Sequence, residues 1–241
     1  DKFIGLGCDA KYYIEQSGVY YDITPIRTNA ATGITFAATN GSSVLTVTHT
    51  GHGAVQGDFV IYSSVTTAGG LGGQITKAIL QQEYKIDEVV NANSYTIRAR
   101  TVQDLSDISV NGVYTPTEVN ADGSDSGNGG GTTGQYQVNS GIDTVVLSNG
   151  WGVGTWGRAG WGEAATINLA TDTLRIWSHD NFGEDLLMNI RNGNIYYWDA
   201  TNGTGTRAVA LSSLAGSISA PTIAKQIMVS DKDRHIIAFG C

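Results

Sequence analysis

Hydrophobic and polar residues alternate along much of this chain in short runs, the pattern of β-strands with one buried face. The clearest alternating runs are Val44–Thr48, Asp58–Tyr62, Tyr84–Val89 and Ser94–Arg98. Sequences rich in Gly, Asn and Ser separate these runs and favour tight turns. We therefore predict a small β module here, built as a barrel or a sandwich.

Three further apolar runs, at Phe3–Cys8, Tyr12–Glu15 and Tyr20–Ile23, predict strands near the N-terminus. Only Ile79–Tyr84 and Val209–Leu214 have a helix-like pattern, and each is equally compatible with a loop. The chain has 32 glycines and only three prolines, with abundant Thr, Asn, Ser and Tyr. This composition is typical of many short strands joined by turns, so the predicted fold class is all-β.

The two ends of the chain have nearly the same sequence pattern. Residues 1–8 and 233–241 share the order acidic, basic, two apolar, small, apolar, Gly, Cys. A short apolar run with a small central residue suits a strand buried on both faces, as inside a β-propeller. Coincidence between two short strands is the alternative interpretation. Without residues 28–135, about 130 residues remain, enough for about three propeller blades.

Changes in composition predict three regions. Residues 1–27 plus 136–241 form a propeller-like β domain, and residues 28–102 form the inserted β module. Residues 103–135 are rich in Gly, Ser and Asp and contain little to bury, so we interpret them as a flexible hairpin or linker. The insertion is expected to lie at a surface turn of the propeller-like domain.

The chain of 241 residues is 41% apolar, which predicts a globular protein, and its formal net charge is −8. Lys and Arg are not clustered, so a nucleic-acid-binding surface is disfavoured. No apolar run approaches the roughly 20 residues that span a bilayer, and we expect no membrane insertion. Cys8 and Cys241 are expected to be small buried thiols. With no initiator Met and no signal peptide, the repeated end phrase predicts a piece of a longer polypeptide.

Several groups of residues resemble chemical sites. His49 and His52 flank a turn glycine, but no cysteine or carboxylate nearby completes a zinc shell. Asn120, Asp122 and Asp125 have the spacing of calcium ligands without a closing Glu, so a structural role is favoured. Glu184 and Asp185 are adjacent, and neighbouring strand residues face opposite ways, so they do not form an acid and base pair. We expect them to cap backbone amides after Gly183.

Three tryptophans, Trp151, Trp156 and Trp161, stand in a glycine-rich run. Exposed aromatic rings stack on sugars, but a spacing of five places successive rings on alternating sides of an extended chain, which favours packing. No nucleophile elbow, phosphate loop or metalloprotease motif is present. We predict that the chain is not an enzyme and has no catalytic, cofactor-binding or metal-binding residues.

Four segments resemble virion structural proteins of tailed bacteriophages, in particular the tail hub or nozzle of short-tailed, podovirus-like phages. These segments are 21–27, 175–187, 194–199 and 233–240. The part of the insertion at 46–60 is similar to small β modules that recur in phage tail proteins. The resemblance covers most of the chain but includes no catalytic residue.

The resemblance implies a propeller-like subunit in a ring of identical copies, a hexamer by family resemblance, around the channel through which DNA leaves. It implies contacts with the portal or adaptor and with tail fibre or spike proteins. It also implies a place in the virion tail, after assembly in the host cytoplasm. The acidic balance agrees with this role, because a negative channel wall repels phosphates and lets DNA slide.

Two functions remain open at this point. One is a structural nozzle or hub that retains the genome and guides its ejection. The other is a glycan-binding or receptor-binding tail module, for which the five Trp and eleven Tyr residues would supply the contacts.

Overall fold

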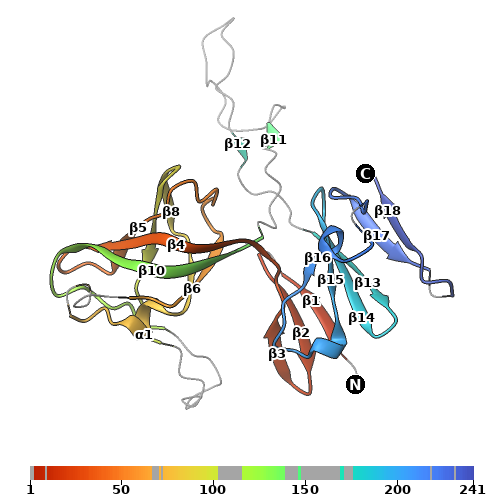
Figure 1. Cartoon of the computed structure of the whole chain (residues 1–241), viewed down its shortest axis with the longest axis horizontal. Helices are drawn as coiled ribbons and strands as arrows, with labels where there is room; N and C mark the ends of the chain where they lie inside the picture. Colours follow the sequence, from red (N-terminus) through yellow and green to blue (C-terminus); the bar gives the residue numbers. More distant parts are fainter. Residues whose placement is uncertain are drawn as a thin grey trace, which may run out of the picture. The chain divides into compact units, whose positions relative to one another are not determined.

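The computed structural model describes residues 3–8, 10–66, 71, 73–102, 116–138, 146–147, 169–170, 176–217, 219–230 and 232–241. The chain divides into two compact units (Figure 1). Unit 1 contains Asp1–Thr24 and Ser140–Cys241, and unit 2 contains Pro25–Asn139. Nearly all regular structure is antiparallel sheet, which confirms the predicted all-β class.

Unit 2 is built on one seven-stranded sheet in the order β7-β6-β10-β4-β5-β9-β8. Its strands are β4 (Ile26–Ala38), β5 (Val44–Thr48), β6 (Phe59–Ser63), β7 (Glu83–Lys85), β8 (Glu88–Asn91), β9 (Ser94–Arg98) and β10 (Asp125–Gln137). The short helix α1 (Lys77–Leu80) precedes β7 and is capped by Thr76. The four alternating runs of the sequence all lie in this sheet.

The sheet of unit 2 is curled, and its two edge strands, β7 and β8, are separated along the chain by only two residues. Ile86 donates its amide to Asp58 at the β6 side, and Asp87 donates its amide to Thr96 on β9. No ladder pairs β7 with β8, so this sheet is not closed into a barrel. The curl encloses a core of apolar side chains. Its largest members are Phe36, Tyr62, Tyr84, Tyr95 and Tyr136.

Strand β10 corrects the linker interpretation of residues 103–135. It pairs with both β4 and β6, and so stands in the middle of the sheet. A Cβ atom at Gly129 would lie 2.7 Å from the Phe36 ring, and one at Gly134 would lie 2.5 Å from Ile34. The glycines therefore leave room for large side chains of β4. The glycine-rich strand β10 has few large side chains of its own, but it covers large side chains of β4. Residues 103–115 lie outside the described part of the chain.

Three of the sheets of unit 1 follow one another in Figure 1. The first is β1-β2-β3 and the second is β13-β14-β15-β16, while β17 pairs with β18. The strands are β1 (Ile4–Gly7), β2 (Tyr12–Gln16), β3 (Val19–Asp22), β13 (Trp177–Phe182), β14 (Asp185–Ile190), β15 (Ile195–Trp198), β16 (Val209–Ala210), β17 (Gln226–Val229) and β18 (Ile236–Phe239). A separate two-stranded ladder joins β11 (Val146–Leu147) and β12 (Leu169–Ala170).

Two short 3₁₀ helices complete the regular structure of unit 1, η1 (Ala200–Asn202) and η2 (Leu211–Ser213). Of the two helix-like segments in the sequence, 79–84 contains the end of α1 and the start of β7, and 209–214 contains β16 and η2. No helix in the described ranges is both long enough and apolar enough to cross a membrane.

Alternation along β13 explains how the three sheets stack. Trp177 and His179 point to the first sheet, where their rings lie 5.2 Å and 5.7 Å from the ring of Tyr12. Ser178 and Asp180 point the other way and bond to the backbone of β17. Because successive strand residues face opposite ways, one strand contacts both neighbouring sheets.

The repeated pattern at the two chain ends forms strands at both ends of this stack. The sequence predicts that both strands are buried, but each is partly exposed. Among the described strands, β1 lies at the edge of its sheet and pairs only with β2, and β18 pairs only with β17. Each packs one face against the stack and leaves the other exposed, with Ile4 and Phe239 among the exposed residues. Cys8 and Cys241 are free and exposed, which corrects the expectation of buried thiols.

Candidate functional site

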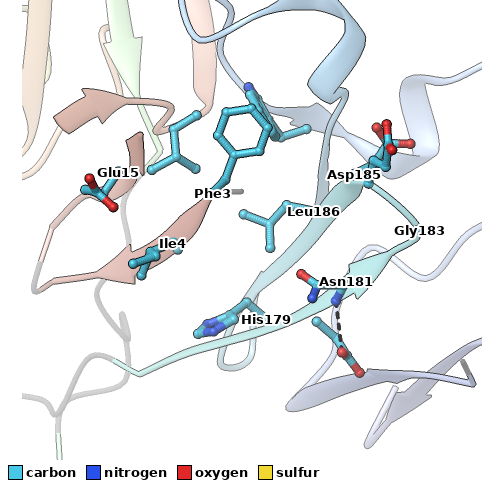
Figure 2. Close-up of a pocket in the computed structure, with 13 residues that line it drawn as sticks. Phe3, Ile4, Glu15, His179, Asn181, Gly183, Asp185 and Leu186 are labelled. Carbon is cyan, nitrogen blue, oxygen red and sulfur yellow. Dashed lines mark hydrogen bonds between the residues drawn. The ribbon is translucent and has the colours of Figure 1, made fainter. Parts of the chain in front are cut away.

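A cavity of about 860 Å³ lies in unit 1 where the first sheet meets β13 and β14 (Figure 2). The tight hairpin between β13 and β14 turns at Gly183, whose φ of 76° favours glycine, and forms one edge of the cavity. The lining residues are Phe3, Ile4, Gly5, Ile14, Glu15, His179, Asp180, Asn181, Gly183, Glu184, Asp185, Leu186 and Trp198.

Apolar and aromatic side chains form the floor of the cavity. Phe3 meets Trp198 edge to face, with ring centroids 5.2 Å apart, and Leu186 points toward Phe3 in Figure 2. Trp198 is buried, and its indole nitrogen donates to the carbonyl of Thr206. Phe3 is half-buried and lines the cavity together with the amide of Asn181 and the imidazole of His179.

Most carboxylates around the cavity already have partners within the fold. Asp180 accepts the amide of Val229 at 2.7 Å, and Glu15 accepts the amide of Gly18. Asp185 accepts the Tyr197 hydroxyl and, at 3.0 Å, the amide of Ala200. Burial, reinforced by the Asp185 carboxylate, raises the pKa of Tyr197. These contacts position loops, and Asp185 bonds a backbone amide as expected from the sequence.

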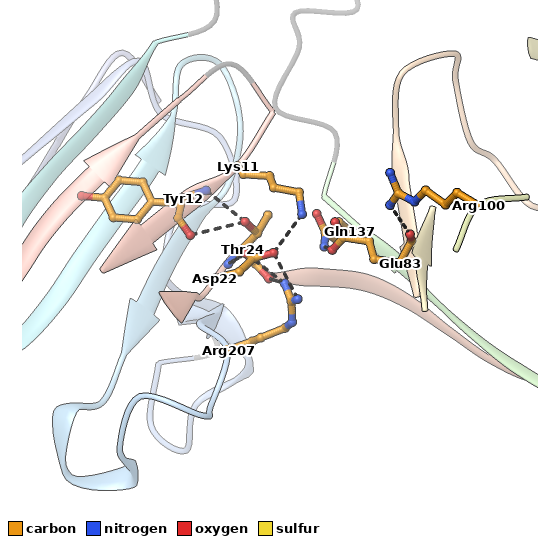
Figure 3. Close-up of polar contacts among 8 residues, drawn as sticks. All are labelled: Lys11, Tyr12, Asp22, Thr24, Glu83, Arg100, Gln137 and Arg207. Carbon is orange, nitrogen blue, oxygen red and sulfur yellow. Dashed lines mark hydrogen bonds and ion pairs between the residues drawn. The ribbon is translucent and has the colours of Figure 1, made fainter. Parts of the chain in front are cut away.

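A second polar cluster of unit 1 centres on Asp22 (Figure 3). Lys11 lies 3.0 Å from Asp22, and the guanidinium of Arg207 bonds to both carboxylate oxygens. Thr24 donates its amide to Asp22 and accepts the Tyr12 amide on its hydroxyl. Burial opposes ionisation, but Lys11, Arg207 and Thr24 outweigh it and lower the pKa of Asp22. The cluster joins β3 to the segment before β16 and is structural.

Unit 2 has its own polar cluster, also drawn in Figure 3. Arg100 donates to the backbone carbonyl of Glu83 at 2.6 Å, and Gln137 donates to the carboxylate of Glu83 at 2.6 Å. The guanidinium of Arg100 also lies over the ring of Tyr84, 5.5 Å from its centroid. These contacts hold β7 against the end of β10.

The residues singled out in the sequence fall in separate places. His49 bonds to Tyr136, whereas His52 accepts the amide of Ala54 and contacts the carbonyl of Asn91. Asp122 accepts the amide of Gln74, and Asp125 begins β10 and bonds to Ser126. In the described ranges no group of three metal-ligating side chains is present. Trp151, Trp156 and Trp161 lie outside the described residues.

The cavity depends on residues that sequence reasoning did not bring together. The sequence pattern predicts a buried strand that contains Phe3, and it places His179 and Asn181 only within a phage-like segment. The strict alternation along 177–182 is a signal that could have shown which side chains face the same way. Their proximity to Phe3 requires the packing of two sheets distant in sequence.

No family model matches the chain, and no curated protein matches it. Among solved structures, the endosialidase of phage phi92 is similar, with 13% sequence identity and a TM-score of 0.29. The similarity covers 95% of this chain but only 32% of that protein. At this TM-score the similarity carries neither a fold nor an activity to this chain.

This comparison does correct one sequence-based prediction. The sequence predicts that the chain is not an enzyme, yet a solved structure that it matches is that of a phage enzyme. The general exclusion of enzymes is therefore wrong, although no reaction is assigned to this chain.

Proposed function

We propose that this chain is a structural component of a phage tail, of the nozzle or hub kind. Copies of it assemble around the DNA exit channel, retain the genome and guide its ejection from the virion. The phage-like segments 21–27 and 233–240 support this role, and both include strand residues of unit 1. The observation that carries the proposal is a pair of exposed apolar faces at the two ends of the stacked sheets.

The first end face consists of Ile4 and Leu6, which share the face of β1 turned away from Trp177. The second end face consists of Met228, Ile237 and Phe239 on the far side of β17 and β18. These five side chains have exposed fractions between 40% and 57%. Their neighbours on the opposite face, such as Ile227 and Ile236, pack into the stack.

Two different apolar faces at the ends of one stack fit a head-to-tail contact, in which the first face of one copy covers the second face of the next. Such heterologous contacts close into a ring when the rotation between copies is suitable. A hexameric ring is the arrangement that the family resemblance implies. The net charge of −8 suits a channel that DNA traverses without binding, next to a portal or adaptor and to fibre or spike proteins.

Assembly is tested on the purified chain by analytical ultracentrifugation and by electron microscopy of single particles. We expect a concentration-dependent oligomer whose formation is lost in a variant carrying Ile237→Asp and Phe239→Asp. Val90→Asp is the matched control, because Val90 is an exposed apolar residue on β8 of unit 2. A chain that stays monomeric at high concentration, or an Ile237 and Phe239 variant that still assembles, contradicts the proposal.

The role in the particle is tested by removing the protein from the phage. Particles without it should package DNA and then fail to retain it, or fail to acquire the lower tail. Complete tails that retain DNA and only fail to adsorb to cells would refute the nozzle role.

A second candidate is a receptor-binding tail module, which the cavity beside Phe3 favours. A ring face next to an amide and an imidazole is the combination that binds a sugar ring and its hydroxyls. The test is saturation-transfer NMR of the isolated chain with purified surface polysaccharide from the host. Signal that disappears in Phe3→Ala and persists in Phe182→Ala supports this candidate, and absence of signal excludes it.

A further inference from the structure

Four side chains of unit 2 form a continuous line of hydrogen bonds from the surface into the core. The Nδ1 atom of His49, which follows β5, lies 2.7 Å from the hydroxyl oxygen of Tyr136 on β10. That oxygen lies 2.8 Å from the hydroxyl of Tyr95 on β9, which lies 2.7 Å from the hydroxyl of Tyr62 on β6. We refer to Tyr62, Tyr95 and Tyr136 as the tyrosine chain.

The tyrosine chain is buried, whereas His49 at its end is half-buried and reaches solvent. Burial raises the pKa of Tyr136 to about 12 and also raises that of Tyr95, so the phenols stay protonated. Each hydroxyl has one hydrogen, and each short O–O contact takes one donor and one acceptor. When all three hydroxyls donate in the same direction, both O–O contacts are bonded and only the hydrogen at one end of the chain needs another acceptor.

The direction depends on the tautomer of neutral His49, and the tautomer with its hydrogen on Nε2 is the one that gives every hydroxyl hydrogen an acceptor. An imidazole that carries its hydrogen on Nε2 accepts at Nδ1, so Tyr136 donates to His49, Tyr95 to Tyr136 and Tyr62 to Tyr95. Every hydroxyl hydrogen then has an acceptor. Among the described residues, the Tyr62 hydroxyl contacts no acceptor other than the oxygen of Tyr95.

The surroundings of His49 disfavour its charged form. Its ring stacks on Tyr136, with centroids 5.4 Å apart, and its backbone amide donates to Asn93. The charged and titratable groups nearby are His52, Arg27 over the Tyr136 ring, and Asp58, which lies 3.6 Å from Arg27. Burial first, and then the positive charges of His52 and Arg27, lower the pKa of His49.

We propose that proton uptake by His49 reverses the tyrosine chain, so that unit 2 carries a proton-sensitive switch between its surface and its core. The solvent proton adds to Nδ1, which becomes a donor to Tyr136. Each hydroxyl then rotates its own hydrogen inward, and no O–H bond breaks. The reversal ends at Tyr62, whose hydrogen is left without an acceptor in the core.

The reversed state is the less stable one, because a buried donor without a partner retains its full desolvation cost. The pKa of His49 is lower in the folded chain than in the unfolded chain, so folding is favoured at high pH. Stability is complete above the unfolded pKa of about 6.5 and falls as the pH drops below it. We expect the melting temperature of unit 2 to fall by several degrees between pH 8 and pH 5 for this reason.

The test follows two carbon resonances of the full chain by NMR as the pH is lowered. The Cε1 resonance of His49 reports its protonation, and the Cζ resonance of Tyr62 reports the orientation of the distant hydroxyl. We expect both resonances to titrate with the same midpoint. A Tyr62 resonance that stays constant while His49 titrates overturns the proposal.

Variants separate transmission through the chain from a general effect of pH. In Tyr95→Phe the link is broken, so His49 should still titrate while Tyr62 no longer follows. In His49→Gln the Tyr62 titration should vanish. The control is His235→Asn, which removes an exposed histidine of unit 1 and should leave the Tyr62 midpoint unchanged. A Tyr62 resonance that still follows the pH in Tyr95→Phe or in His49→Gln also overturns the proposal.

Discussion

The guanidinium of Arg207 bonds to both carboxylate oxygens of Asp22, at 3.3 Å each, although the two residues are 185 positions apart. The same guanidinium donates to the carbonyl of Thr24 at 2.7 Å. Lys11, which is largely buried, adds a second cation to the carboxylate. This network fastens the N-terminal sheet to the C-terminal part of unit 1.

Asp22→Asn should lower the free energy of unfolding of unit 1 by about 2 kcal/mol, because it removes the partly buried carboxylate that Lys11 and Arg207 contact. Chemical denaturation followed by circular dichroism measures the loss. Asp87→Asn is the control, since Asp87 pairs with Arg98 at an exposed site and should change stability by less than about 0.5 kcal/mol. Equal effects of the two changes would mean that burial of the network does not matter.

The lowered pKa of Asp22 predicts that the stability of unit 1 depends on pH in the acid range. The pKa of Asp22 is lower in the folded chain than its usual value of 3.8. Its contribution is therefore fully present above pH 3.8 and is lost as the pH falls through the folded pKa. Acid titration of the denaturation midpoint should show this loss in the natural chain and a shallower slope in Asp22→Asn. An unchanged slope would assign the acid sensitivity to other carboxylates.

Gly7→Ala should destabilise unit 1 by about 1–3 kcal/mol. A Cβ atom at Gly7 would lie 2.8–2.9 Å from three atoms of Trp177, whose indole nitrogen also donates to the carbonyl of Cys8. Gly205→Ala is the control, because a Cβ atom there meets nothing within 4 Å. Thermal unfolding of both variants measures the difference, and a Gly7 variant as stable as the control would show that Trp177 moves freely.

The fragment 25–139 should fold by itself, whereas the shorter fragment 28–102 should not. The shorter fragment lacks β10, without which β6 and β7 lose their pairing to the other four strands. Amide spectra should be dispersed for 25–139 and collapsed for 28–102. Dispersed amides from the shorter fragment would show that β10 is dispensable.

Both cysteines should react with a maleimide reagent in the native state, since both are free and exposed. Mass spectrometry should find two labels on each chain without denaturant. Labelling of only one thiol, or of neither before unfolding, would restore the original expectation of buried cysteines.

The sequence determined the fold class and most strands, because alternation of apolar and polar residues is a local property. Val44–Thr48 and Ser94–Arg98 are strands with the expected bounds. The pattern failed at β10, where glycines fit around Phe36 and Ile34 of another strand. A glycine that leaves room for a neighbouring side chain adds nothing to the apolar pattern of its own strand.

Tertiary structure alone decided which faces are buried and which residues meet. The end phrases share one pattern, but their exposure depends on whether a second sheet covers each face. The cavity beside Phe3 and the bond between Asp22 and Arg207 join segments far apart in sequence. Contacts of this kind arise from the packing of sheets, so no local pattern of residues encodes them.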